Sequence, residues 1–189
     1  MSNRASQIIV LCEDKLHYVF VKRFLKKWGV SNHAIREEYQ QGQGSGAANV
    51  IADFPKQLEA VRSRSHRAIT ILIVVIDADN KTVEERKGEL EKALEDAGMP
   101  KVADDERICC VIPKWSMDTW LAYLQDGNAS EDESYKNSLR FRNRESEAHP
   151  LIDMLAEKCK QREALKDPPD SLSKACKEFE RIRDALVGL

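Results

Sequence analysis

The sequence predicts an α/β fold in which a mostly parallel four-stranded sheet is flanked by helices and followed by a C-terminal helical extension. Segment 69–76 (ITILIVVI) is apolar on both faces and too short for an ordinary helix, as expected of a central parallel strand that helices cover on both sides. Segments 7–12 and 107–113 are two further short apolar runs. Stretches with helical spacing separate these runs, and this alternation is typical of a parallel sheet.

The first half of the chain alternates strands with helices. Its expected elements are a strand at 7–12, a helix at 15–28, a strand at 33–39 and a helix at 47–61. The first helix turns Lys and Arg outward and ends at Gly29. The second strand is more polar and is expected near an edge of the sheet. The glycine-rich segment 42–46 partly matches a dinucleotide-binding fingerprint, but it follows the second strand and not the first. We therefore interpret it as a loop that closes over a site.

The second half continues the alternation and then becomes helical. Its expected elements are the central strand at 69–76, a helix at 82–97, a strand at 107–113, a helix from Ser116, and helices at 149–164 and 171–186. Thr82 and Glu85 have the spacing of a capping box. An acidic, turn-rich linker at 127–135 follows residues 1–126, which we expect to form an α/β domain. We expect residues 127–189 to form a helical extension packed on that domain.

The charge balance limits the partners of the protein. Lys and Arg total 30 against 32 Asp and Glu, which gives a net charge of −2. No overall charge therefore attracts nucleic acid or a membrane, and any polyanion must meet a local patch. One candidate patch is 139–144 (LRFRNR), where arginines surround Phe141 and could grip a nucleic-acid backbone. The alternative is a polar segment whose apolar side chains pack inward.

Cysteine usage and hydropathy indicate the compartment. The five cysteines are odd in number and form no Cys-x-x-Cys, so neither a disulfide framework nor a zinc cage is indicated. Cys12, Cys109 and Cys110 lie in apolar runs and are expected in the core. No apolar run reaches the length of a membrane span. We expect a cytoplasmic protein that does not contact a membrane.

Acidic side chains follow three of the four predicted strands. Glu13 ends the first strand, Asp77 and Asp79 end the central one, and Asp118 lies shortly after the fourth. Ligands bind at the carboxyl edge of such sheets, and crowded carboxylates favour a cation, above all Mg²⁺, which takes oxygen ligands. The alternative is a solvated turn that caps the next helix. His17 has no spaced partner, and we interpret it as structural.

Glu13 at the end of the first strand and Asp77-x-Asp79 at the end of the central one resemble the signature of the Toprim domain of topoisomerases, primases and related nucleases. The resemblance covers 7–124. It implies a Toprim-like sheet, Mg²⁺ or Mn²⁺ as cofactor, DNA or RNA as substrate, and metal-dependent phosphodiester cleavage. Glu13 would be the acid-base residue and would also contact the metal, with Asp77 and Asp79 as metal ligands. The departure is Asp14, because many family members have a glycine soon after the glutamate.

The segment 112–124 (IPKWSMDTWLAYL) is similar to small stand-alone Toprim-like proteins of bacterial defence loci. That resemblance adds Asp118 to the metal ligands and suggests an effector of an anti-phage defence system, with an ATPase as a partner. Lys15, next to Glu13, and Lys114, after the fourth strand, could steady negative charge that develops during the reaction. We do not expect topoisomerase activity, because it needs a separate tyrosine-bearing domain that a chain of this length is too short to supply.

Two other classes of function stay open from the sequence. A phosphoacceptor receiver domain also combines acids after its first strand with a later Asp and Lys, as Glu13, Asp14, Asp77 and Lys114 could, although the spacing is unlike that of receivers. The other class is a non-catalytic Toprim-like subunit that uses the helices after Ser116 to dock on a larger ATPase complex.

Overall fold

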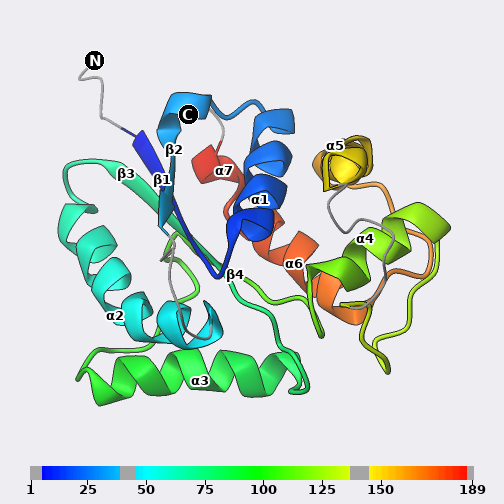
Figure 1. Cartoon of the computed structure of the whole chain (residues 1–189). Coiled ribbons are helices and arrows are strands. Elements are labelled where there is room, and N and C mark those ends of the chain that lie inside the picture. The colour runs from blue at the N-terminus through cyan, green and yellow to red at the C-terminus, as the bar shows by residue number, and fades with distance from the viewer. Residues whose placement is uncertain (1–5, 39–45, 137–144, 187–189) are drawn as a thin grey trace.

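A computed structural model of the chain describes residues 6–38, 46–136 and 145–186 (Figure 1). Its centre is a four-stranded, all-parallel sheet with the strand order β2-β1-β3-β4. The strands are β1 (Ser6–Cys12), β2 (Ile35–Glu38), β3 (Ile69–Val75) and β4 (Ile108–Val111). The predicted α/β fold with a parallel sheet is confirmed. The more polar strand β2 lies at an edge, as its sequence indicated.

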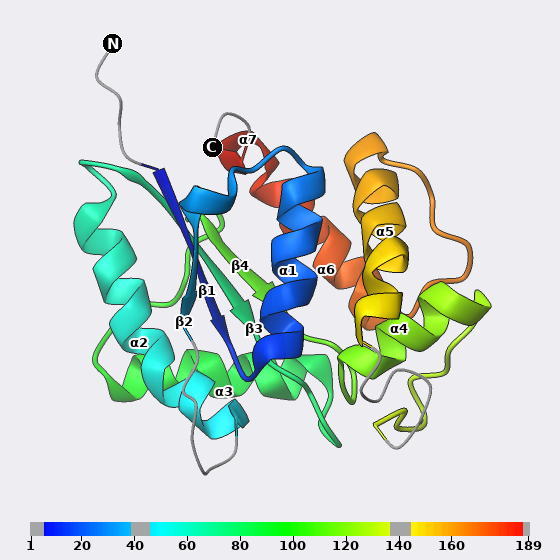
Figure 2. The ribbon, with the colours of Figure 1, turned by 45° about the horizontal axis from the view of Figure 1, so that its top comes forward.

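Helices cover both faces of the sheet, so the fold has three layers (Figures 1 and 2). The helices are α1 (Lys15–Lys27), α2 (Gly46–Arg64), α3 (Val83–Asp96), α4 (Met117–Asp126), α5 (His149–Gln161), α6 (Asp170–Arg181) and α7 (Arg183–Leu186), with 3-10 turns η1 (Asn32–Ala34) and η2 (Glu145–Ala148). Helices α2 and α3 pack on one face of the sheet, and the remaining helices build the core on the other.

Strand β3 is buried from Thr70 onward because both layers pack on it. The side chains of residues 71–76 are 0% exposed. Alternate residues face opposite layers, with Ile71 and Ile73 in the core beneath α1 and Leu72 and Val74 in the core beneath α2. An apolar run without alternation is what a strand between two helical layers requires.

The helix ends follow local sequence signals. Thr82 caps α3, and the predicted capping box is present, with Thr82 Oγ1 accepting from the Glu85 amide and Glu85 accepting from the Thr82 amide. Helix α5 ends earlier than predicted, where Arg162 adopts a left-handed φ of 58°. The predicted final helix is divided at Ile182 into α6 and α7.

The C-terminal helices share a core with the α/β part. Ile152 of α5 and Phe179 of α6 are buried in the same cluster as Phe24 of α1 and Trp120 of α4, and the rings of Phe24 and Phe179 stack with centroids 4.3 Å apart. The division at residue 126 stays a prediction. In the described part of the chain, every helix is too short or too polar to span a bilayer.

Candidate metal centre at the carboxyl edge of the sheet

The candidate centre lies where β1 and β3 end side by side. The two strands run side by side in the same direction (Figure 2), and Cys12 pairs with Val75, so Glu13 and Asp77 follow at the same edge. With the order β2-β1-β3-β4, the chain leaves β1 toward one side of the sheet and β3 toward the other. Such a switch in direction opens a crevice at the carboxyl ends of the two central strands.

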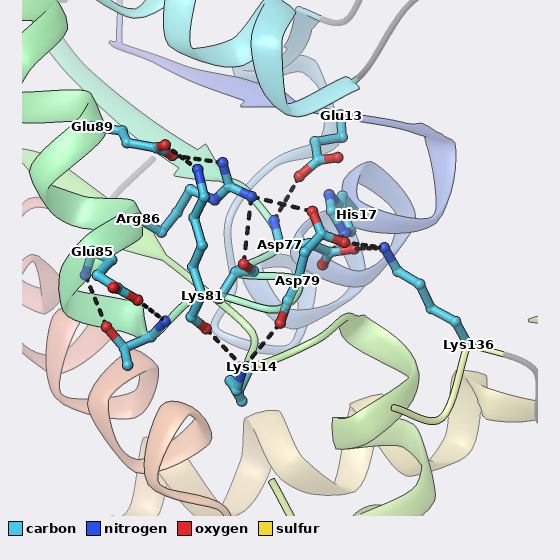
Figure 3. A network of polar contacts seen from close by, with 12 residues as sticks. Glu13, His17, Asp77, Asp79, Lys81, Glu85, Arg86, Glu89, Lys114 and Lys136 are labelled. Carbon is cyan, nitrogen blue, oxygen red and sulfur yellow. Dashed lines mark hydrogen bonds and ion pairs between the residues drawn. The ribbon is translucent and has the colours of Figure 1, made fainter. Parts of the chain in front are cut away.

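Glu13, His17 and Asp77 form a group that could hold a metal ion, because one donor atom from each lies within 4.8 Å of the other two. The imidazole Nε2 of His17 lies 3.0 Å from Asp77 Oδ1. The main-chain amide of Asp77 donates to Glu13 Oε1 over 2.6 Å. His17 and Asp77 are 1% and 6% exposed. Figure 3 shows the three side chains converging from α1 and from the ends of β1 and β3.

From the sequence we interpreted His17 as a structural residue. That interpretation is incomplete, because the imidazole contacts Asp77 of the candidate centre. Asp14 caps α1 and accepts from the His17 amide over 3.0 Å, which fixes the first turn of α1 directly after Glu13. The partner of the ring, Asp77, lies 60 residues away in sequence. The sequence offered one local indication of this role, because His17 lies in the first turn of the helix that follows Glu13 and Asp14.

Burial and crowded charges shift the titration of the centre. Burial raises the pKa of Glu13, the charge of Asp77 raises it further, and His17 partly opposes both. Burial lowers the pKa of His17, but its hydrogen bond to Asp77 and the charges of Asp77, Asp14 and Glu13 outweigh burial and raise the pKa to about 9. The centre therefore carries an excess of negative charge that protons or another cation must balance.

The donor set fits a divalent transition metal. Two carboxylates and an imidazole suit Mn²⁺ and similar ions, whereas Mg²⁺ prefers oxygen ligands alone. Neighbouring donors about 2.1 Å from an octahedral ion lie about 3.0 Å apart, and the distance of 3.0 Å from His17 Nε2 to Asp77 Oδ1 matches that spacing. The Nδ1 atom of His17 is buried with no hydrogen-bond partner among the described residues, so it can carry the proton when Nε2 is a ligand.

Asp79 lies beside this group but has cationic partners of its own. Its carboxylate accepts from Arg86 Nη2 at 3.1 Å and from Lys136 Nζ at 2.5 Å. Its backbone is left-handed, with φ 54°, and its amide donates to Trp115, which also has a positive φ of 64°. Such a conformation is uncommon outside glycine. The loops after β3 and β4 are thus joined at Asp79 (Figure 3).

Two cations of the site were not foreseen from the sequence. Lys136 Nζ also lies 3.5 Å from Asp77 Oδ2. Partial desolvation lowers the pKa of Lys136, but the hydrogen bond to Asp79 and the charges of Asp77 and Asp79 outweigh it and raise the pKa. Arg86 is 5% exposed and joins Asp79 to Glu89. Arg86 follows Asp79 by seven residues within the first turns of α3, whereas Lys136 is 57 residues from Asp79, beyond the reach of a local pattern.

The other predicted site residues lie around this group. Asp118, in the first turn of α4, accepts from Ser116 Oγ over 3.1 Å, and burial together with the charge of Asp77 raises its pKa. Lys15 is exposed on α1 and lines a surface pocket with residues that include His149. The roles of Asp118 and Lys15 stay predictions.

Lys114 is held by main-chain carbonyls, and its predicted role in the reaction stays a prediction. Its Nζ donates to the carbonyls of Asp79 and Lys81, at 2.9 and 2.7 Å, and lies 4.1 Å from the centroid of the Trp115 ring. The ammonium thus fixes the loop after β3, because it is engaged by two carbonyl oxygens and an aromatic face. It orients Asp79 through the main chain.

The amino terminus of α2 closes over Glu13. A Cβ atom placed on Gly46 would lie 2.8 Å from Glu13 Cβ and 3.0 Å from Glu13 Oε2. Only a glycine lets the start of α2 approach the carboxylate this closely. The rest of the predicted glycine-rich loop and the arginine-rich segment 139–144 lie outside the described residues.

Comparison of the chain with protein-family models, with characterised proteins and with solved structures finds no match.

Proposed function

We propose that this chain is a metal-dependent phosphodiesterase that cleaves nucleic acid, with Glu13, His17 and Asp77 holding the cation. The observation that carries the proposal is the convergence of these three donors within 4.8 Å at the switch point of a parallel sheet. The resemblance of Glu13 and Asp77-x-Asp79 to the Toprim signature supports the same chemistry. So does the order of the acids along the chain, each following a strand that ends at this edge.

The sequence predicted Mg²⁺ or Mn²⁺ with Asp79 and Asp118 among the ligands. The contacts of the described residues favour a smaller ligand set that includes His17, and therefore Mn²⁺ over Mg²⁺. Asp79 is oriented by Arg86 and Lys136, which suits a role at the rim of the centre. A bound divalent cation would neutralise charge on a phosphoryl oxygen and activate a water molecule.

Glu13 is the residue suited to move a proton. Its raised pKa brings the carboxyl group closer to neutral pH, where it can both accept and return a proton. The amide of Asp77 holds one carboxylate oxygen, Oε1, in place. The second oxygen, Oε2, faces the start of α2 at Gly46, where the first amides of the helix are suited to bind an anion such as phosphate.

Lys136 is the residue suited to meet the substrate. Its ammonium lies between Asp77 and Asp79, and its side chain is 46% exposed. With a metal ion on Asp77, the ammonium of Lys136 would keep its contact with Asp79 and could turn a hydrogen from Asp77 toward a phosphate oxygen. Such a contact stabilises charge that grows in the transition state.

The test combines metal binding with cleavage. Purified chain, freed of metal with a chelator, is titrated with Mn²⁺ while its melting temperature is followed, and the same samples receive single-stranded and double-stranded DNA and RNA. At free Mn²⁺ a hundredfold above the dissociation constant, the folded state gains about 2.7 kcal/mol by mass action. We expect cleavage in the same concentration range.

Asp77→Asn should lose the gain in stability and the cleavage together, because it removes a charged ligand. Glu95→Gln, on the exposed side of α3, is the matched control and should behave like wild type. A melting temperature that Mn²⁺ leaves unchanged in the wild type contradicts the metal centre. Metal binding without cleavage of any of the four substrates contradicts the nuclease assignment alone.

The alternatives from the sequence have their own experiments. A receiver domain would be phosphorylated by acetyl phosphate at Asp77, but there Lys114 is engaged by two carbonyls of the β3 loop and His17 contacts the carboxylate. A stable mass increase of one phosphate would favour it. A defence role with an ATPase partner predicts copurification of that partner with the tagged chain from its native host.

A further inference from the structure

Two of the five cysteines meet far from the candidate metal centre. Cys159 lies in the last turns of α5 and Cys176 lies in α6, and their sulfur atoms are 2.8 Å apart. All five cysteines are thiols in this structure. A disulfide requires the sulfurs to approach to about 2.05 Å, so a small side-chain movement separates this pair from a covalent bond. The odd cysteine count gave no sign of it.

Both cysteines border a surface pocket. Cys159 and Cys176 line one surface pocket together with Leu165 and Pro168 of the α5–α6 connection, and both side chains are half-buried. An oxidant of small size can therefore enter. Cys12 and Cys109, by contrast, are 2% and 0% exposed in the core.

We propose that Cys159 and Cys176 are a redox modification site that a peroxide converts into an intramolecular disulfide between α5 and α6. In the first step the Cys159 thiolate attacks a peroxide oxygen. The O–O bond breaks, Cys159 becomes a sulfenic acid, and the second oxygen leaves as water or an alcohol after taking up a proton. In the second step Cys176 attacks the Cys159 sulfur, the S–O bond breaks, and a second water leaves. Two thiols lose two electrons, and the peroxide gains them.

Thiol acidity supports the same order of events. The hydrogen bond from Cys176 lowers the pKa of Cys159, whereas the pKa of Cys176 is raised by the same bond and by burial. Burial raises the pKa of Cys12 and of Cys110 to about 12 and that of Cys109 well above its usual range. Since the thiolate is the reactive form, Cys159 is the nucleophile and Cys176 the resolving thiol.

The bond would fix the packing of two helices that support the site indirectly. Helix α5 holds α1 through the pair of Arg23 with Asp153 and through Trp28 Nε1, which donates to the Ala156 carbonyl. Helix α6 begins beside the loop after β4, where the Ser171 hydroxyl accepts from the Lys114 amide. A covalent link between α5 and α6 would therefore connect the helix that contacts α1 with the helix that contacts the loop after β4.

The experiment treats the reduced full-length chain with hydrogen peroxide, removes the excess, and counts thiols under denaturing conditions. We expect five thiols to become three, a mass loss of two hydrogen atoms, and one cross-linked peptide pair that contains Cys159 and Cys176; a dithiol reductant should restore all five. The matched control Cys110→Ser should lose two thiols in the same way.

The single variants separate the two roles. In Cys176→Ser we expect a sulfenic acid at Cys159, trapped by a cyclic diketone, and in Cys159→Ser we expect Cys176 to stay reduced. Retention of all five thiols by the wild type, a cross-link that pairs other cysteines, or a disulfide between chains would each overturn the proposal. None of these results depends on metal binding or on cleavage of nucleic acid.

Discussion

At the scale of single residues, Asp77 contacts three other residues of the candidate centre. Its amide holds Glu13, one carboxylate oxygen meets His17, and the other lies 3.5 Å from Lys136. In the metal-free state, His17 and Lys136 supply the positive charge that a divalent ion would otherwise bring. Protons and metal therefore compete for the same carboxylates, and the competition has measurable consequences.

The pH dependence of folding should report the His17 contact. The pKa of His17 in the folded chain, about 9, lies above its ordinary value of 6.5, so its stabilising effect is complete below pH 6.5 and disappears as the pH rises toward 9. The shift corresponds to a loss on the order of 3 kcal/mol. Urea unfolding in a chelator between pH 6 and 10 measures it, and His17→Gln should remove most of the slope below pH 8, because the buried cysteines with raised pKa contribute only near pH 9 and above. An equal slope in both proteins would contradict the assignment.

Glu13→Gln should separate proton transfer from metal binding. The amide side chain keeps an oxygen for the cation but cannot exchange a proton, so turnover should fall by about two to four orders of magnitude. Stabilisation by Mn²⁺ should persist, weakened by the missing charge. Single-turnover cleavage at saturating metal measures the effect, and a wild-type rate would remove Glu13 from the mechanism.

Residue types at strand ends could be predicted from the sequence, but their partners could not. Glu13, Asp77 and Asp79 each follow an apolar run, which is a local signal. His17 and Lys136 acquire their roles from residues 60 and 57 positions away, and only the folded chain sets such distances. The sequence placed Lys114 near the site, but it did not indicate where the side chain points. The ammonium points to the carbonyls of Asp79 and Lys81, which are contacts that only the folded loop provides.

At the scale of elements, local rules were sufficient for strands and helix starts. The run 69–76 became the central strand, and Thr82 with Glu85 formed the predicted capping box. Errors fell at helix ends such as Arg162, where packing and a left-handed residue stop α5 before its amphipathic pattern ends. The close approach of α2 to the end of β1 could not be predicted either, because a glycine such as Gly46 in a turn-rich segment does not indicate which residue packs against it.

Gly46→Ala should test how α2 and the end of β1 fit together. The added methyl group would meet the Cβ and Oε2 atoms of Glu13, so α2 or the carboxylate must shift, at a cost of about 1–3 kcal/mol typical of overpacking. We expect weaker Mn²⁺ binding and slower cleavage. Gly88→Ala in α3 is the control, because its Cβ meets nothing within 4 Å, and it should stabilise by about 1 kcal/mol through helix propensity. Equal behaviour of the two variants would contradict the close contact.

At the scale of the whole molecule, the balance of charge would decide how the chain binds the nucleic acid that we propose as its substrate. A net charge of −2 gives no long-range attraction to a polyanion. The cations near the centre are largely engaged, with Arg86 held by Asp79 and Glu89 and Lys114 held by carbonyls. Of these three cations, Lys136 is the one that is exposed, and its ammonium lies between Asp77 and Asp79. Among the described residues near the centre, we therefore expect few to neutralise phosphates at once, and we expect a partner protein to contribute further contacts.

The isolated chain should therefore cleave slowly at physiological salt and respond only weakly to salt. Two phosphate contacts predict about a tenfold loss of affinity between 50 and 200 mM salt, whereas six contacts predict a loss of a thousandfold or more. Measuring kcat/KM on one duplex across that range gives the slope, and Lys136→Gln should reduce it by about one contact. A steep slope in the wild type would mean that an extended basic surface exists beyond the residues near the centre. In that case the chain would not need a partner to hold its substrate, and fast turnover of the purified protein would accompany the steep slope.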